Sequence, residues 1–222
     1  ILFIVNPFAG TSSKVNIAEQ IPKLLDLNTY DYKIRFTGHP RHGYELAEEA
    51  VKEGVDIIIA NGGDGTVNEV ASAIVGSERT FGIIPGGTGN GFSMHLGLGR
   101  SFQKAMKAIN GGRIIKIDTC RLNGSFYVNV AGFGFDAKVA FLTKDNKDRG
   151  FTHYFTTTLK ESKKFKAEQL RLDIDGKIVE GNYAAAVVAN ASRYGYSFTI
   201  APSAQLTDGL LDITLIKEAT VP

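Results

Sequence analysis

The chain has 222 residues, of which 43% are hydrophobic and 22% are charged, and its formal net charge is +2 at pH 7. This balance is typical of a folded globular protein and excludes a disordered chain and a strongly basic nucleic-acid binder. The single cysteine, Cys120, excludes an intrachain disulfide and favours the cytoplasm, a reducing compartment. No run approaches the ~20 apolar residues of a membrane span, so any membrane contact is expected to be peripheral.

The first 112 residues alternate between strand and helix patterns. Apolar runs predict strands at 1–5, 32–37, 55–60 and 81–84. Helical spacing follows the first three strands, and we expect Pro22 to kink the first helix and Pro40 to occupy the first turn of the second. The alternation predicts an α/β domain with a parallel, doubly wound sheet and ligand loops at the carboxyl ends of its strands.

The pattern changes after Gly111-Gly112, which we predict to separate a domain at 1–112 from one at 113–222. Asn123-Gly124 and Asp175-Gly176 each join two apolar runs, as hairpin turns do. Further strands are predicted at 114–122, 126–130, 170–174, 178–179, 183–189 and 210–216, with a helical stretch at about 151–166. The second domain is therefore expected to be mostly antiparallel and β-sandwich-like.

The strongest functional signal is the Asn-Gly-Gly-Asp-Gly-Thr loop at 61–66. Glycines let main-chain N–H groups approach a phosphate, and a following helix amino terminus favours the anion. A carboxylate there repels phosphate unless a divalent cation lies between them, so Asp64 is interpreted as a magnesium partner. A capping box formed by Thr66 and Glu69 is the purely structural alternative.

Two further glycine-bearing loops, at 6–10 and 85–91, are expected at the same sheet edge and complete a nucleotide cradle. The motifs Asn-Pro-x-x-Gly, Gly-Gly-Asp-Gly-Thr-x-Asn-Glu and Pro-x-Gly-Thr-x-Asn, in this order, resemble the diacylglycerol kinase catalytic domain of lipid kinases. The segments 117–118, 129–136 and 201–212 extend the resemblance over nearly the whole chain. It implies an NAD kinase/phosphofructokinase-like first domain and ATP-dependent phosphorylation of a lipid hydroxyl such as that of diacylglycerol.

The resemblance also implies roles for individual residues. Asp64, helped by Asp118 through water, would hold the catalytic Mg²⁺. Asp208, with the backbone oxygens of Gln205 and Leu210, would bind a second, structural metal, whereas the residues alone favour a simple turn. The positions matched to ATP binding are Asn6, Pro7, Phe8, Ala9, Gly10, Thr37, Gly63, Asp64, Gly65, Thr66, Val67, Asn68, Glu69 and Thr88.

The sequence departs from the family pattern in two ways. Gly91 stands where bacterial members commonly have aspartate, so the pattern does not specify the lipid headgroup. The family's general base is the glutamate of an Asp-Gly-Glu segment, which these residues lack, so we expect it beyond Pro222 and the second domain to be incomplete at its carboxyl end. The chain as given is therefore expected to bind nucleotide without turning it over.

Two other functions stay open at this point. A soluble-substrate kinase of the NAD kinase type shares the phosphate loop, and a non-catalytic nucleotide-binding module that senses lipid is favoured by the missing glutamate. The residues 132–137 fit the dinucleotide pattern G-x-G-x-x-A, but we assign their strand to a hairpin rather than a βαβ unit, which argues against NAD binding.

The segment from Lys138 to Arg171 carries nine Lys or Arg and four Asp or Glu, interleaved with aromatic residues. This composition predicts docking on an anionic membrane surface, with a solvated helix face as the structural alternative. The expected partners are thus a lipid substrate and the inner face of the membrane. A homodimer is compatible with the sequence, and no nucleic-acid partner is expected.

Overall fold

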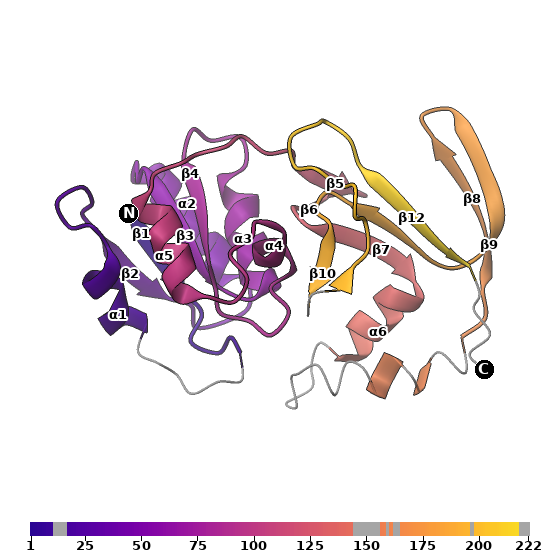
Figure 1. Ribbon diagram of the computed structural model, residues 1–222, viewed down its shortest axis with the longest axis horizontal. Coiled ribbons are helices and arrows are strands. Elements are labelled where there is room, and N and C mark those ends of the chain that lie inside the picture. The colour runs from indigo at the N-terminus through magenta and orange to yellow at the C-terminus, as the bar shows by residue number, and fades with distance from the viewer. Residues whose placement is uncertain (11–16, 144–155, 159, 162–164, 196–197, 218–222) are drawn as a thin grey trace.

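The computed structural model describes residues 1–10, 17–143, 156–158, 160–161, 165–195 and 198–217. It has two lobes, one up to Asn110 and one from Cys120, joined by a stretch without regular structure (Figure 1). We call them the first and the second lobe. Among the described residues, no helix combines the length and the apolar character needed to cross a bilayer.

Four parallel strands form the sheet of the first lobe, in the order β2-β1-β3-β4. They are β1 (Leu2–Val5), β2 (Lys33–Phe36), β3 (Ile57–Gly62) and β4 (Thr80–Pro85). Val5 pairs with both Phe36 and Asn61, and Asn61 pairs with Ile84, so all four strands end at one edge. This confirms the predicted parallel sheet and places the loops after β1, β3 and β4 together.

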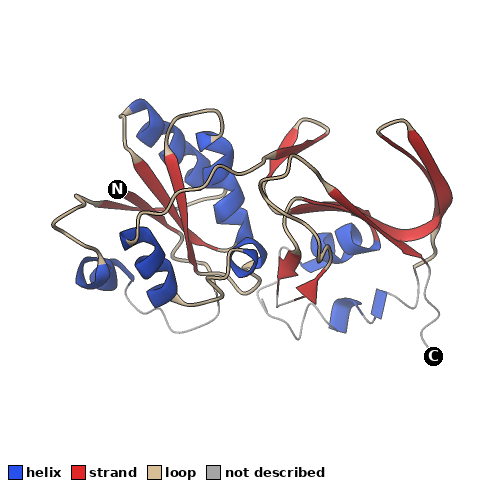
Figure 2. Ribbon diagram, turned by 45° about the horizontal axis from the view of Figure 1, so that its top comes forward, coloured by secondary structure: helices blue, strands red, loops and turns tan. Residues whose placement is uncertain are grey.

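Helices cover both faces of this sheet (Figure 2). They are α1 (Ile17–Leu24), α2 (His42–Lys52), α3 (Asp64–Ile74), α4 (Gly91–His95) and α5 (Phe102–Asn110). Because successive side chains of a strand point to opposite faces, Leu2 and Ile4 pack with α2 and α3, whereas Phe3 and Val5 pack with α1 and α5. The doubly wound arrangement thus follows from central strands with apolar residues on both faces, such as β1, which is apolar and buried at every position.

The second lobe is built around the long strand β9 (Lys177–Ala189). The first half of β9 pairs with β8 (Glu168–Ile174), and its second half lies between β7 (Val130–Gly134) and β12 (Asp212–Lys217), all antiparallel. Smaller pairs are β5 (Cys120–Leu122) with β6 (Ser125–Tyr127) and β10 (Arg193–Gly195) with β11 (Phe198–Thr199). The helix α6 (Phe135–Thr143) packs on β7 and β9.

Both predicted hairpins are confirmed. The turn residues Asn123, Gly124, Asp175 and Gly176 have φ of 49°, 79°, 50° and 83°, the left-handed backbone that a tight two-residue turn needs. Asn and Asp tolerate this conformation better than other side chains, and Gly adopts it freely. Local turn chemistry therefore determined these two features.

Other expectations were wrong. Of the strand predicted at 114–122, only Cys120–Leu122 forms a strand. The residues before Cys120 cross between the lobes without a partner strand, and Ile114 is 65% exposed there. The strand predicted at 126–130 is divided between β6 and β7, which pair with different strands. Pro40 lies before the first residue of α2, not in its first turn, because Arg41 is the N-cap.

The helices α4 and α5 were not predicted, although Ser101 caps α5 by accepting the N–H of Lys104. The helical stretch expected at about 151–166 falls largely outside the described residues. Pro22 lies inside α1, as expected. The strand that precedes the G-x-G-x-x-A pattern is β7, which pairs antiparallel with β9 and not within a hairpin, so the pattern is not part of a βαβ unit.

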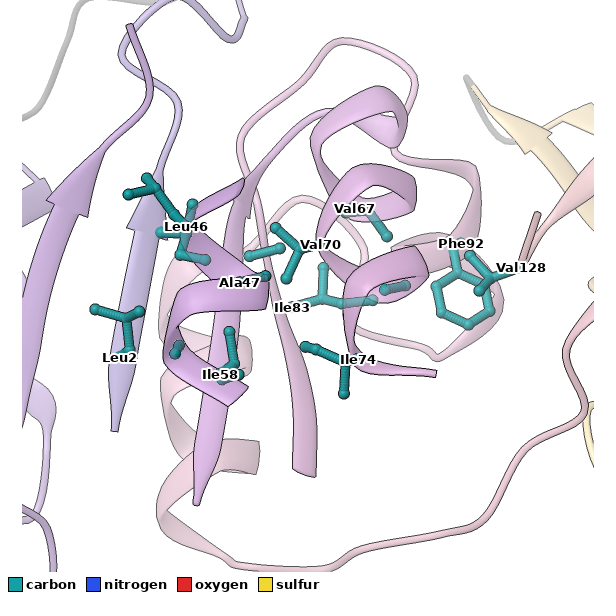
Figure 3. Packing of buried hydrophobic residues seen from close by; sticks show 14 of the residues in the cluster. Leu2, Leu46, Ala47, Ile58, Val67, Val70, Ile74, Ile83, Phe92 and Val128 are labelled. Carbon is teal, nitrogen blue, oxygen red and sulfur yellow. The ribbon is translucent and has the colours of Figure 1, made fainter. Parts of the chain in front are cut away.

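The lobes meet where α4 packs against β10 and α3 packs against β6. Figure 3 shows Phe92 of α4 beside Val128 of the second lobe, and both are buried. An isolated bridge pairs Asn90 with Gly195 across the same contact. A single hydrophobic cluster therefore extends from the first-lobe sheet into the second lobe.

Candidate active site

Glycine backbones meet at the carboxyl edge of the first-lobe sheet. A Cβ added to Gly87 would lie 2.4 Å from the Cα of Gly63, and one added to Gly10 would lie 2.5 Å from the carbonyl oxygen of Gly86. The Gly86 N–H also donates to the Gly62 carbonyl at 2.8 Å. The loops after β1, β3 and β4 are thus packed main chain on main chain, and only glycine permits this approach. We call this surface the cradle.

Most of the glycine motif at 61–66 belongs to regular structure, because β3 runs through Gly62 and α3 begins at Asp64. Only Gly63 lies between them, and no side chain at this N-cap position hydrogen-bonds to the helix. The amino terminus of α3 therefore faces the cradle uncapped, which favours an anion there. The capping box of Thr66 and Glu69 is not formed, because the helix starts before Thr66.

Asn6 fixes the first loop of the cradle. Its side-chain N–H donates to the Thr66 hydroxyl at 2.9 Å, and its side-chain oxygen accepts the Phe8 N–H at 2.9 Å. Its own N–H donates to the Asn61 carbonyl. The loop leaves Phe8 64% exposed, so the aromatic ring lies at the surface beside the cradle.

Asp64 is the half-buried first residue of α3. Burial raises the pKa of its carboxyl above the ordinary value of 3.8, and hydrogen bonds from the N–H groups of Phe92, Gly91 and Asn90 oppose that shift. These donors belong to the first turn of α4, so the carboxylate joins the starts of two helices. Its Oδ2 would lie 2.8 Å from a Cβ at Gly89, which brings it against the third loop.

The structure divides the other positions matched to ATP binding. Thr37 is buried at the end of β2, where its N–H donates to the Val5 carbonyl at 2.9 Å, and the Thr88 carbonyl accepts Arg100 Nη2 at 2.7 Å. Glu69 points to α2, because its Oε1 accepts the Arg41 N–H at 3.1 Å. Pro7 and Ala9 lie in the first loop, and Gly65 is exposed in the first turn of α3.

A cavity of about 230 Å³ lies between the lobes, with Asp64 in its wall. Val67 and Asn68 line it from α3, and Asn68 also donates to the Phe126 carbonyl across the lobe boundary at 3.2 Å. The second lobe contributes side chains that sequence reasoning did not single out, among them Tyr127 and Tyr194. Burial, reinforced by the neighbouring Cys120, raises the pKa of Tyr127 to about 12, so its hydroxyl keeps its proton at neutral pH.

Asp118 binds neighbouring segments of the second lobe, and its water-mediated role beside Asp64 stays a prediction. Its Oδ2 accepts the Gly209 N–H at 2.8 Å, its N–H donates to the Leu206 carbonyl at 2.7 Å, and its carbonyl accepts Asn190 Nδ2 at 3.0 Å. Asn190 also donates to the Val128 carbonyl at 2.8 Å. The buried Asn190 therefore connects Asp118 to the wall of the cavity.

The residues matched to a structural metal lie in an exposed turn before β12. Asp208 Oδ1 accepts the Leu210 N–H at 3.0 Å, and Gly209 between them has φ of 72°. Gln205 is exposed in the same segment. The structure thus brings these residues together in one turn, next to Asp118, and the metal there stays a prediction.

Two family models match the chain. The diacylglycerol kinase catalytic domain matches residues 1–122, and the YegS C-terminal NAD kinase beta sandwich-like domain matches residues 129–221. The chain belongs to the diacylglycerol kinase catalytic-domain family of lipid kinases. It is by this membership an ATP-dependent phosphotransferase with an alcohol group as acceptor, as the motifs predicted.

Individual relatives agree with the family models. This lipid kinase is 28% identical over 226 residues to a diacylglycerol kinase of Bacillus subtilis, covering 98% of this chain and 74% of the relative. It is 30% identical over 226 residues to one of Mycobacterium tuberculosis, covering 96% and 72%. A crystal structure of a diacylglycerol kinase from Bacillus anthracis has a TM-score of 0.74 at 28% identity, covering 98% and 73%.

Proposed function

We propose that this lipid kinase binds ATP and Mg²⁺ at the cradle and phosphorylates the hydroxyl of diacylglycerol, presented to the cavity between the lobes. One observation carries the proposal: Asp64 stands at the amino terminus of α3, against the cradle, and in the wall of the cavity. A carboxylate at that junction lies where donor and acceptor would meet. Phosphoryl transfer depends mainly on such positioning and on charge stabilisation.

The cradle fits a polyphosphate. Its glycines keep Cβ atoms away from the surface, and the uncapped start of α3 provides a favourable dipole. ATP, when bound, supplies the γ-phosphoryl group, and Mg²⁺ supplies positive charge that a carboxylate such as that of Asp64 can hold. The N–H groups of Asn90, Gly91 and Phe92 keep this carboxylate in one orientation. Asp118, proposed as a second magnesium partner through water, orders the neighbouring turn with its carboxylate.

The cavity fits the polar head of a lipid rather than the whole molecule. Its volume of about 230 Å³ is below the roughly 300–1,000 Å³ of sites that enclose a drug-sized ligand. The carboxylate of Asp64 and the amide of Asn129 can accept hydrogen bonds from hydroxyl groups, whereas Val67 and Phe92 provide apolar walls. Acyl chains are then expected to lie outside the cavity.

Peripheral membrane contact is part of the proposal. The helix α6 leaves Phe141 66% and Leu142 46% exposed, and apolar side chains of this kind can insert into the headgroup region. Lys138 on the same helix pairs with Glu161 at 2.9 Å, so its charge is partly compensated. The remaining cations of the basic segment 138–171 lie largely outside the described residues. We place the enzyme at the cytoplasmic face of the membrane.

The change Asp64→Asn tests the role of the carboxylate. Turnover should fall by at least about 10²-fold, because the charge is lost while the shape remains. The folded-state pKa of Asp64 is raised, so its contribution to stability is present below the unfolded value of 3.8 and is lost as pH rises through the folded value. At neutral pH the variant should therefore melt at the same temperature or higher.

The assay uses diacylglycerol in mixed micelles with labelled ATP, beside thermal melting of both proteins. A stable Asp64→Asn variant that retains wild-type turnover would contradict the assignment. Assays with NAD as acceptor and no lipid provide the other comparison, since a soluble-substrate kinase would work without micelles. Turnover of NAD and not of lipid would replace the proposed acceptor.

A further inference from the structure

The β2–α2 connection carries a group of side chains that the kinase site does not use. Within the described residues, His39, His42 and Glu45 are the group in which three metal-ligating side chains offer atoms within 4.8 Å of one another. His39 Nε2 lies 3.6 Å from Glu45 Oε2, and the two imidazole rings stack with centroids 4.3 Å apart at an interplanar angle of 5°. The three residues therefore converge on one small volume at the surface.

Hydrogen bonds determine which nitrogen of each ring has a lone pair. His39 Nδ1 lies 3.0 Å from the Pro40 carbonyl, which only accepts, so Nδ1 carries the hydrogen and Nε2 has the lone pair. A histidine that donates its other N–H to a backbone carbonyl is the usual arrangement of a metal ligand. In the neutral ring, the lone pair of His39 Nε2 and the carboxylate of Glu45 are then two acceptors side by side, which a metal ion between them would satisfy, as would a proton on Nε2.

The ring of His42 is held differently. Its Nδ1 accepts the Gly38 N–H at 2.9 Å, so a metal ion binding to this ring displaces that hydrogen bond. Gly38 is exposed, so water can replace the lost partner at small cost. One ion cannot lie in the planes of two parallel stacked rings, so His42 also has to rotate out of the stack when the ion binds. A neutral pair of histidines is the form that binds metal.

The backbone is already arranged for this convergence. Arg41, between the two histidines, has φ of 65°, a left-handed conformation that is uncommon for a residue with a side chain. Its N–H is held by Glu69 Oε1, which comes from the neighbouring helix α3. His42 and Glu45 then lie one turn apart on α2, on the same side of the helix. Packing outside the group thus fixes the loop that places His39 over His42.

We propose that His39, His42 and Glu45 bind a divalent transition metal of the Zn²⁺ class, with water completing the coordination. Two imidazoles and one carboxylate are a ligand set for zinc, copper or nickel, whereas Mg²⁺ and Ca²⁺ prefer oxygen ligands. The site is separate from the Asp64 cavity and does not depend on the proposed kinase reaction. Because its ligands are largely exposed, the ion should exchange readily with chelators.

Calorimetry with Zn²⁺ on chelator-treated enzyme, without ATP or lipid, tests the proposal. We expect one ion per chain and a loss of affinity of at least about tenfold in His39→Ala, His42→Ala and Glu45→Gln, since even an outer partner of a ligand is worth 10–100-fold. Glu48→Gln, on the next turn of α2, is the matched control and should bind as the wild type does. Thermal melting checks that each variant is folded.

A second measurement reports on the geometry. Zn²⁺ should shift the Gly38 amide resonance in the wild type, because the Gly38 N–H loses its acceptor, and should leave it unchanged in His42→Ala. Equal Zn²⁺ affinity in all four variants would locate the ion elsewhere and overturn the proposal. The kinase assignment would survive that result, because neither experiment measures phosphoryl transfer.

Discussion

At the cradle the first lobe presents glycine main chain, whereas the second lobe contributes side chains to the cavity, which Asp64, Val67, Asn68 and Phe92 of the first lobe also line. In the cradle, glycine backbones lie so close that a Cβ added to Gly87 would be 2.4 Å from the Cα of Gly63. The second lobe lines the cavity with Tyr127, Asn129 and Tyr194. Main-chain N–H groups suit a phosphate chain, which is the same in every nucleotide. Side chains suit an acceptor alcohol, whose shape and hydrogen bonds differ between lipids. We therefore expect the first lobe to bind the phosphate chain common to all nucleotides and the second lobe to distinguish between acceptor lipids.

The two lobes also differ in packing. The strand β3 is buried along nearly its whole length between two layers of helices, with Ile58, Ile59 and Ala60 at most 1% exposed. In the second lobe the central strand β9 buries mainly small residues, such as Ala185, Ala186 and Ala189, and β8 alternates between exposed and half-buried positions. The first lobe is therefore expected to resist movement more strongly than the second.

The largest effect is expected from Gly87→Ala in the cradle. The new Cβ would lie 2.4 Å from the Cα of Gly63, and neither backbone can move without disturbing β3 or β4. We expect unfolding stability to fall by roughly 3 kcal/mol, the upper end of the usual cost of overpacking, with loss of ATP binding. Denaturant titration and ATP calorimetry measure the two effects.

Gly65→Ala is the matched control for stability. Nothing lies within 4 Å of a Cβ at Gly65, and alanine favours a helix more than glycine does. Its melting temperature should be equal to or higher than that of the wild type. If Gly87→Ala were as stable as Gly65→Ala, the cradle would not depend on contact between backbones.

A smaller effect on stability, with a selective effect on chemistry, is expected from Gly91→Ala. The added Cβ would lie 2.4 Å from the Tyr194 carbonyl and 2.6 Å from that of Arg193, both in the second lobe. Because the lobes can separate slightly, we expect a loss of roughly 1–2 kcal/mol. ATP binding should persist while lipid phosphorylation falls. If Gly91→Ala lost ATP binding and lipid phosphorylation to the same extent, nucleotide binding would not be a property of the first lobe alone.

The smallest effect concerns the pH dependence of the lobe contact. His95 of α4 faces the second lobe, where its Nδ1 accepts the Ser192 N–H at 3.0 Å and lies 2.8 Å from the Ser192 hydroxyl. Burial, and then the charge of Arg193, lowers the pKa of His95 below the ordinary value of 6.5. Its contribution is therefore present above pH 6.5 and lost as pH falls through the folded value.

Chemical denaturation of the wild type and of His95→Gln between pH 7.5 and 5 measures this contribution. The wild type should lose more stability on acidification, because a protonated Nδ1 cannot accept the Ser192 N–H and the imidazolium faces Arg193. Glutamine retains an acceptor and does not titrate. Parallel pH profiles for the two proteins would exclude His95 as the titrating group.

Features that depend on local chemistry were predicted well. The four parallel strands follow from apolar runs, and the hairpins follow from Asn123-Gly124 and Asp175-Gly176. The linker before Cys120 was predicted as a strand because Ile114 and Ile115 have strand character, yet a strand also needs a partner, which sequence alone does not give. The helix α5 was missed although Phe102, Ala105 and Met106 have helical spacing after a serine cap.

The candidate site was predictable only on the side of the first lobe. The Gly-Gly-Asp-Gly motif placed Asp64 at the cradle, because the ends of parallel strands must meet at one edge. The cavity depends on how the second lobe docks, so Tyr127 and Tyr194 carried no recognisable signal. Asn129 lies in the segment 129–136, which resembles the lipid kinases, but the resemblance did not mark it as a site residue. Glu69 was matched to ATP binding, but its carboxylate accepts a hydrogen bond from Arg41, the N-cap of α2. Arg41 lies 28 residues earlier, so the sequence does not reveal this partner.

Contact between glycine backbones also restricts how this enzyme can diverge. The glycine contacts of the cradle offer few positions at which substitution can adjust nucleotide affinity, because a Cβ at Gly87 would lie 2.4 Å, and one at Gly63 3.3 Å, from the Cα of the other glycine. Adaptive change must then be concentrated across the lobe boundary, at residues such as Tyr127, Asn129 and Tyr194. A mutant library for new acceptor alcohols should therefore cover the residues that line the cavity, with the glycines of the cradle left untouched.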